Sequence, residues 1–507
     1  MHKFSWTTLL ISILIVIYLS LFMLLITNDR WSDGDEVHYL LISSSILKDG
    51  DLVLDNNYEN KDYFTHHSNE EKPTAYKGKN DELRPPGGIL TSIIVTPGYG
   101  LGLVVSKFVN FQSNRFFLFF PRLTILIVHI FFSIILIKYL MALGFNKNLS
   151  LLCVILYLIQ LPVILYSQAI YPDLLSGYFV MTGILGILIF SNNKKNKWLI
   201  ISGSIFGLSI FLHSKLIVYT SVLILSSFIY LHFIFKQKSE LNNLSGNDFS
   251  FRDWFKRGQY RKIIYSILGP WVAFLVLNIL MKFYWFGSFY FDGIAKETKR
   301  GGYFSLIANP LKGWLGQWLD IEVGLLPNAP LLALIFTGLF IWYKKQKSSF
   351  LLIVPPTLFY LLLVSSITFW HAGFCPPGRY LQFAVPILLP GLCWVLWSSK
   401  KIIWLRWLIG ALAFFSLLLS SLILFVGRRG LPYSKGYNIY WRTILEFLNL
   451  DFLEPYISLN FFNPGLLDYI IGIIIFILFI GLGLYLQKKS AFMQDDFPAI
   501  KKDKFIQ

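Results

Sequence analysis

The sequence contains little charge and almost no cysteine. Asp, Glu, Lys and Arg make up 14% of the 507 residues, whereas they make up about a quarter of an average soluble domain. The three cysteines, Cys153, Cys375 and Cys393, form no spaced pair, so neither a disulfide framework nor a thiolate metal site is expected. The sequence also has no glycine-rich phosphate loop and no internal repeat. These absences argue against a nucleotide-binding enzyme and against a transporter built from repeats.

The sequence is instead rich in hydrophobic residues. They make up 55% of the sequence and form runs of 18 or more uncharged residues. Because a helix needs about 20 apolar residues to cross a bilayer, the sequence predicts an all-α polytopic membrane protein with about twelve transmembrane helices. The expected spans are 6–26, 116–137, 150–170, 174–190, 198–212, 216–235, 263–285, 328–343, 350–369, 380–398, 402–426 and 465–486. The first is expected to be an uncleaved anchor, since no small-residue cleavage site follows it.

The basic residues predict which ends of the spans face the cytoplasm. Segment 84–108 is apolar enough to be a further span, but counting it as one would place the basic clusters 192–197 and 344–347 outside. If this segment lies along the outer surface instead, every basic cluster falls on the cytoplasmic side, as the positive-inside rule requires. We therefore expect both termini in the cytoplasm. The resulting layout is one transmembrane domain over 1–507, a large first extracytoplasmic loop at 27–115 with juxtamembrane surface helices, and a cytoplasmic tail at 487–507.

Two adjacent acids, Asp35 and Glu36, follow the first span. The apolar residues after them recur at roughly helical spacing, which predicts a surface helix that carries both acids in its first turn. His38 and Tyr39 follow the pair after one residue, Val37. One interpretation is purely structural, because a helix N-terminus favours negative charge. The other is that the carboxylates take part in a reaction at the membrane surface, and this stretch alone does not decide between the two.

Further polar side chains are expected on the same outer face. They are Arg84 ahead of two prolines, Asp173 after Pro172, His213 and Lys215 in one short turn, and His371 and Arg379 in another. Taken singly, an acid suits the first turn of a helix and a base can extend its side chain to the interface. Together, acids and bases converge on one side of the membrane, which is the arrangement that a reaction on an anionic lipid substrate needs.

In combination, four of these features resemble the GT-C superfamily of membrane glycosyltransferases. They are the Asp-Glu pair, a basic residue before Pro-Pro, a Tyr-Pro-acid turn after the third span, and Gly-Arg-Tyr-Leu opening a late span. The motifs are similar to those of bacterial relatives of protein O-mannosyltransferases and lipid A aminoarabinose transferases. The stretch 313–330 also resembles bacterial members, and we expect a structural role for its acids Asp320 and Glu322. The soluble repeat domain of eukaryotic protein mannosyltransferases and the Trp-Trp-Asp signature of oligosaccharyltransferases are missing.

The resemblance implies transfer of a sugar from a polyprenyl-phosphate donor to a protein, lipid or glycan acceptor. The reaction would take place on the extracytoplasmic face of a bacterial cytoplasmic (inner) membrane, by a single displacement that inverts the anomeric centre, with no nucleic-acid partner. The motifs assign the role of general base to Asp35. Glu36 and Asp173 would orient the sugar or the acceptor, or hold a cation in metal-using members. The residues specify no cofactor, and the need for a divalent cation stays open.

The resemblance also implies which residues bind the donor phosphate. Arg84 is the first candidate, because family members carry a basic residue before Pro-Pro. Lys215, Arg379 and His213 are further candidates by their position near the outer face, and His38, Tyr39 and His371 are other candidate site residues. The adjacent His66 and His67 are expected to lie in a solvated loop and not to bind a metal.

Two alternative functions use the same lipid-linked glycans. A flippase or transporter would need ionisable residues near the middle of the bilayer, and the expected spans are almost free of charge. A polymerase that extends glycan chains outside the membrane is harder to separate from a transferase, although it would not need the acid pair and the Arg-Pro-Pro stretch in one loop.

Overall fold

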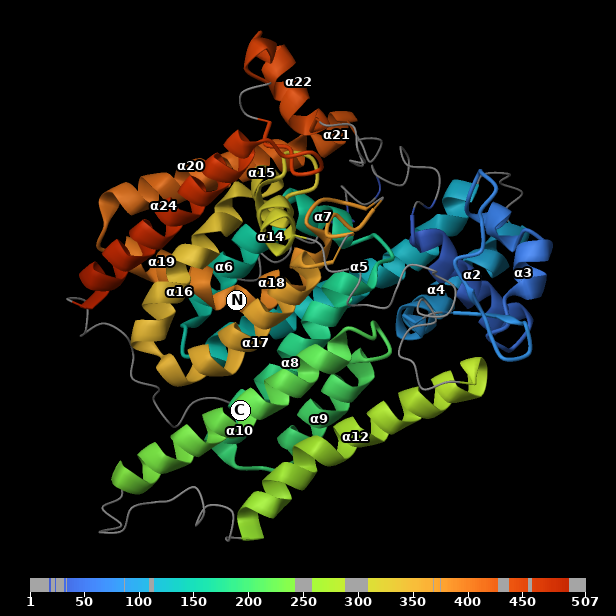
Figure 1. Ribbon diagram of the computed structural model, residues 1–507, viewed down its shortest axis with the longest axis horizontal. Coiled ribbons are helices and arrows are strands. Elements are labelled where there is room, and N and C mark those ends of the chain that lie inside the picture. The colour runs from blue at the N-terminus through green and yellow to red at the C-terminus, as the bar shows by residue number, and fades with distance from the viewer. Residues whose placement is uncertain are drawn as a thin grey trace, which may run out of the picture.

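The structure is a computed structural model in which helices pack side by side in a broad bundle (Figure 1). It describes residues 18, 19, 23, 32, 34–85, 87–108, 114–241, 258–287, 309–367, 369–373, 375–426, 437–454 and 458–491. The prediction of an all-α membrane protein is confirmed, since the regular structure in this part is helical apart from one two-stranded hairpin.

Eight helices in the described part are long and apolar enough to cross a membrane. They are α4 (Ile89–Phe108), α5 (Asn114–Ala142), α8 (Pro172–Asn193), α10 (Leu216–Leu241), α12 (Gly258–Phe286), α17 (Lys347–Ser365), α20 (Ile403–Ser421) with α21 (Ile423–Val426), and α24 (Leu466–Ala491). Seven of them coincide with expected spans. The eighth, α4, falls on segment 84–108, so its place along the outer surface stays a prediction.

Four expected spans are shorter or broken. They correspond to α6 (Lys147–Leu158) with α7 (Leu161–Tyr166), to α9 (Lys197–Ser209), to η3 (Pro330–Ala333) with α16 (Leu334–Lys345), and to α18 (Arg379–Leu388) with α19 (Pro390–Ser399). The last pair is bent by 55°. Pro386 and Pro390 explain the bend, because proline has no N–H to donate and its ring clashes with the preceding turn. The first expected span, 6–26, lies almost entirely outside the described residues.

The first loop folds as a small unit against the bundle. It contains α2 (Glu36–Lys48), α3 (Asp55–Glu59), η1 (Asp62–Thr65) and the antiparallel hairpin of β1 (Tyr76–Lys77) and β2 (Leu83–Arg84). Val37, Leu41 and Tyr58 belong to its own apolar core. The hairpin is also tied to the end of α12, because the Lys79 N–H donates to the Trp285 carbonyl at 2.8 Å.

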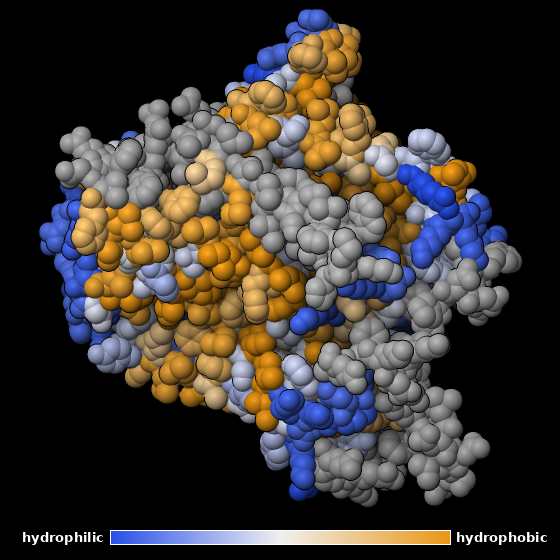
Figure 2. All heavy atoms as spheres, turned by 180° about the vertical axis from the view of Figure 1, so that it is seen from behind, coloured by the Kyte–Doolittle hydropathy of each residue, from blue (hydrophilic) through white to orange (hydrophobic). Residues whose placement is uncertain are grey.

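Short elements cover the same end of the bundle. They are α14 (Pro310–Leu319), α15 (Leu325–Asn328), α22 (Ile439–Phe447) and η5 (Asp451–Leu453). Figure 2 shows a broad hydrophobic region over the middle of the opposite view, with hydrophilic patches at the edge where the first loop lies and at the right and lower edges. Such a distribution is expected when lipid surrounds the middle of a helical bundle.

Helix α8 occupies the centre of the bundle, with 83% of its apolar window buried. It packs closely against α18 through Gly177, where an added Cβ would lie 2.4 Å from the Phe383 carbonyl oxygen. Gly177 is one helical turn beyond Asp173, and Phe383 is one turn beyond Arg379. The close approach of the two helices therefore fixes the separation of these two charged residues.

We predict that Gly177→Ala lowers stability by about 1–3 kcal/mol, because the methyl group would force two packed backbones apart. The measurement is thermal unfolding of the detergent-solubilised protein. Gly410→Ala in α20 is the matched control, because no atom lies within 4 Å of its added Cβ. Alanine should be neutral or slightly stabilising there. Equal unfolding midpoints for the two variants would contradict the close packing.

Candidate active site

Asp173 is the centre of a charged cluster at the end of the bundle that carries the first loop. Its Oδ1 accepts a hydrogen bond from Lys215 Nζ at 3.1 Å, and its Oδ2 accepts one from Arg379 Nε at 2.9 Å. The carboxylate is 1% exposed. A buried carboxylate is stable when cations and hydrogen bonds compensate for lost hydration, and Asp173 has two cationic donors. The cluster therefore joins the starts of α8, α10 and α18.

Arg379 extends the cluster to the first loop. Its Nη2 pairs with Asp35 Oδ2, and its Nη1 donates to the Ala372 carbonyl at 3.1 Å. The guanidinium also lies 4.7 Å from the centre of the Tyr171 ring. One planar side chain thus links segments that are more than 300 residues apart in the sequence. Arginine suits this position because its donors point in fixed, separate directions.

Asp35 and Asp173 differ in accessibility. The Asp35 side chain is 48% exposed, whereas that of Asp173 is 1% exposed. Asp35 occupies the N-cap position of α2, but its side chain makes no capping hydrogen bond and reaches Arg379 instead. A carboxylate at a helix start usually stabilises the free N–H groups of that helix. The Asp35 side chain therefore does not cap α2 and is part of the charged cluster.

Glu36 lies beneath Asp35 and is fully buried. Its Oε1 accepts a hydrogen bond from the Ile170 N–H at 2.8 Å, and its Oε2 pairs with Arg122 Nη2 at 3.1 Å. These contacts fasten α2 to α5 and to the segment that leads into α8. Glu36 therefore holds the backbone three residues before Asp173, and its expected role in orienting the sugar or the acceptor stays a prediction.

The α9–α10 turn places two candidates beside the cluster. Lys215 Nζ lies 4.1 Å from the centre of the Tyr380 ring. The backbone N–H of Lys215 donates to His213 Nδ1 at 3.4 Å. Burial lowers the pKa of Lys215, and Asp173 counteracts part of that shift. Burial also lowers the pKa of His213 well below its usual value, and neighbouring Lys215 adds to this effect. His213 is therefore neutral near pH 7 and can offer a donor or an acceptor, but no charge.

The other predicted side chains also have defined contacts, and Tyr39 lies close enough to Asp35, Arg379 and Asp173 to interact with their charges. Arg84 Nη2 pairs with Glu82 at 2.6 Å, and His38 Nδ1 lies 3.0 Å from the Tyr58 hydroxyl. Tyr39 packs under Gly88, and His371 Nδ1 accepts a hydrogen bond from the Gly373 N–H at 3.2 Å. His371 belongs to the same short segment as Ala372 and so lies in the wall of the site.

The expectation of solvated histidines in the first loop is wrong. His66 and His67 are both buried, and one ring nitrogen of each lies within hydrogen-bond distance of a backbone carbonyl. His66 Nε2 lies 3.2 Å from the Val37 oxygen, and His67 Nδ1 lies 2.7 Å from the Ser32 oxygen. In the part of the chain that the structure describes, no group of three or more His, Cys, Asp or Glu side chains is arranged to hold a metal ion.

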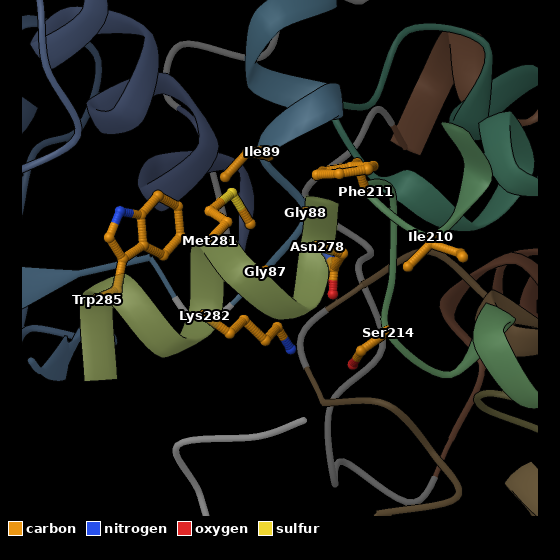
Figure 3. Close-up of a pocket in the computed structure, with 10 residues that line it drawn as sticks. All are labelled: Gly87, Gly88, Ile89, Ile210, Phe211, Ser214, Asn278, Met281, Lys282 and Trp285. Carbon is orange, nitrogen blue, oxygen red and sulfur yellow. The ribbon is translucent and has the colours of Figure 1, made fainter. Parts of the chain in front are cut away.

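A small pocket next to the cluster contains a lysine that the sequence analysis missed. Figure 3 shows the side chains of Lys282 and Asn278, both from α12, extending to the side where Ser214 lies, and Gly87 and Gly88 line the same pocket. Lys282 is 3% exposed although it belongs to an apolar span. A single ionisable residue within a span is a signal for a functional position. That signal was present in the sequence, where Lys282 falls inside the expected span 263–285.

The glycine pair shapes this pocket. Gly88 has a positive φ of 71°, and a Cβ there would lie 2.7 Å from Tyr39 Cε1. Only glycine adopts this backbone and leaves room for the tyrosine ring. The pocket therefore combines an ammonium group, a hydroxyl, an amide side chain and a backbone without side chains. These are groups that can bind an anion.

No protein-family model and no curated protein matches this sequence. Among solved structures, the chain is similar to ArnT from Cupriavidus metallidurans in the apo state, with 12% identity and a TM-score of 0.48 over 95% of this chain and 77% of that one. It is also similar to an Archaeoglobus fulgidus oligosaccharyltransferase in the apo form, with 14% identity and a TM-score of 0.41 over 90% of this chain and 60% of that one. A further structure is AglB from Archaeoglobus fulgidus in complex with an inhibitory peptide and a dolichol-phosphate, with 14% identity and a TM-score of 0.41 over 88% and 56%.

We predict that Arg379→Ala costs about 3–5 kcal/mol of stability, because it removes one of the two cations that compensate a buried carboxylate. Arg442→Ala is the matched control. Arg442 pairs with Glu454 at 3.1 Å, but it is 38% exposed. Its loss should cost no more than about 1 kcal/mol. Unfolding of both variants in detergent tests this difference, and similar losses would mean that the Asp173 cluster is well hydrated.

Proposed function

We propose that this integral, multi-pass membrane protein is a glycosyltransferase of the GT-C type. It moves a sugar from a polyprenyl-phosphate-linked donor to an acceptor on the extracytoplasmic face of the membrane. The observation that carries the proposal is the bridge of Arg379 between exposed Asp35 and buried Asp173, with Lys215 beside it. An accessible carboxylate next to fixed cations matches the needs of a transfer in which a phosphate leaves.

Asp35 acts as the general base in this proposal. The acceptor hydroxyl attacks the anomeric carbon of the donor sugar while Asp35 takes the hydroxyl proton. The bond between the anomeric carbon and the phosphate oxygen breaks, and its electron pair stays on the phosphate. A single displacement of this kind inverts the anomeric centre. Arg379 holds the Asp35 carboxylate in place, and the 48% exposure of that side chain leaves it open to an acceptor.

Basic groups stabilise the charge that develops on the leaving phosphate. Lys215 and Arg379 contact Asp173, Arg379 also contacts Asp35, and Lys282 lines the neighbouring pocket, so three cations lie around the proposed site. The pocket itself is small, so we place the phosphate at its mouth, beside Lys282, Gly87 and Gly88. Arg84 begins the turn that leads to these glycines, so its proposed contact with the phosphate is compatible with this position.

The distribution of charged residues supports a proposed location of the site at the membrane surface. Asp173, Lys215 and Arg379 all belong to helix starts at one end of the bundle. Polar groups confined to one end favour chemistry at the membrane surface over a flippase or a transporter, which needs a charged path through the bilayer. We place this end outside the cytoplasmic membrane of a bacterium, with both chain termini inside. The polyprenyl chain then reaches the site from the bilayer between the helices.

We predict that Asp35→Asn lowers sugar transfer by about a hundredfold or more, because asparagine keeps an acceptor for Arg379 but cannot take the proton. The assay follows radiolabelled sugar from membrane-extracted polyprenyl-phosphate donors in vesicles, at matched expression. Asp81→Asn in the same loop is the control and should transfer as the wild type does. Equal activity of Asp35→Asn would remove Asp35 from the mechanism. Movement of labelled lipid between leaflets without transfer would favour the flippase.

We predict that Lys282→Met raises the KM for the lipid-linked donor roughly tenfold or more and changes kcat less, because it removes a charged hydrogen-bond donor from the phosphate pocket. Lys79→Met serves as the control. It removes a positive charge from the same end of the protein, where Lys79 Nζ lies 4.7 Å from the Tyr284 ring. An unchanged KM in Lys282→Met would mean that the phosphate binds elsewhere.

A further inference from the structure

Asp320 is a buried acid outside the charged cluster. It follows the last residue of α14 and is 1% exposed. Its Oδ1 accepts hydrogen bonds from the Glu322 and Val323 N–H groups at 2.9 and 3.0 Å, and its Oδ2 accepts one from the Phe461 N–H at 2.7 Å. One carboxylate therefore fixes a tight turn in one outer segment and the backbone of a second segment more than 100 residues away.

The turn at Asp320 supports the residue that precedes Arg379. The Val323 carbonyl accepts a hydrogen bond from the Gly378 N–H at 2.8 Å. Gly378 has a positive φ of 68°, and a Cβ there would lie 2.9 Å from Leu325 Cδ1. The start of α18, where Arg379 is the first helical residue, thus rests on the turn that Asp320 organises.

The second segment reaches Arg379 from the other side. Phe462 follows Phe461, and its ring lies 4.9 Å from the ring of His371. The Phe462 carbonyl also accepts a hydrogen bond from Lys312 Nζ at 2.8 Å. His371 adjoins Ala372, whose carbonyl accepts the Arg379 Nη1 bond. Both the backbone and the guanidinium of Arg379 are therefore supported by groups that Asp320 holds.

We infer that Asp320 is a positioning residue, which keeps the Arg379 guanidinium aligned between Asp35 and Asp173. This inference rests on the proposed function for its effect on sugar transfer, but the positioning itself is a property of the fold. Asp320 acts only as an acceptor toward three N–H groups. Asparagine has nearly the same shape, yet its NH₂ group would have to face at least one of these donors. Asp320→Asn thus disturbs the support of Arg379 while leaving the volume unchanged.

The test is a double-mutant cycle of Asp320→Asn and Arg379→Lys. Two properties are measured for each variant, the sugar-transfer kcat/KM in vesicles and the midpoint of thermal unfolding. We expect Asp320→Asn to lower kcat/KM about tenfold or more when Arg379 is present, and less than about threefold when residue 379 is lysine. The two substitutions should also be non-additive in the unfolding midpoint. Asp51→Asn is the control, because Asp51 also accepts a backbone N–H, from Val53 at 3.0 Å, but lies in the first loop away from Arg379.

Each outcome separates the two proposals. If the effects of Asp320→Asn are the same with arginine and with lysine at 379, in both measurements, Asp320 is an ordinary structural residue and the inference is wrong. If the unfolding midpoints are non-additive but the wild type transfers no sugar, the positioning role stands and the proposed function fails.

Discussion

The arrangement of this protein depends on compensation for one buried negative charge. Asp173 begins the central helix α8 and has almost no contact with solvent. A lone carboxylate there would be too costly to keep ionised. Lys215 and Arg379 remove that cost, and in doing so they bring the starts of α10 and α18 to the start of α8. The contacts that compensate the charge of Asp173 therefore also assemble the end of the bundle that carries the first loop.

Arg379 has a second function that lysine could not provide. Its Nε is used by Asp173, which leaves the two terminal nitrogens for Asp35 and for the Ala372 carbonyl. The first loop is thereby connected to the interior of the bundle through one side chain. Glu36 and Arg122 add a deeper connection between the loop and α5. The accessible carboxylate of Asp35 is thus carried by a framework of buried ion pairs and is not left on a free loop.

Much of this was predictable from the sequence. Seven of the eight long apolar helices in the described part of the chain match expected spans, because a long uncharged run in a membrane protein nearly always forms a spanning helix. Asp35, Asp173, Lys215 and Arg379 were expected on one outer face, and the structure brings their side chains together. Side-chain partners were not predictable, since hydropathy does not reveal which charges meet. The pairing of Glu36 with Arg122 was therefore not expected, and Lys282 was overlooked within an apolar run.

Because the charged residues lie at helix starts, insertions near these starts are restricted in related sequences. Each residue added within the first turn of α8, α10 or α18 would rotate a charged side chain by about 100° around its helix axis. Exposed apolar residues of α10 such as Leu225 and Ile229 are less restricted, because one lipid-facing residue can replace another, whereas Gly177 of α8 is restricted by its packing against α18. Loops between the helices can also change in length, as long as each helix still begins at its charged residue. Relatives of this protein can thus differ at most positions and keep the same few residues at the same end of the bundle.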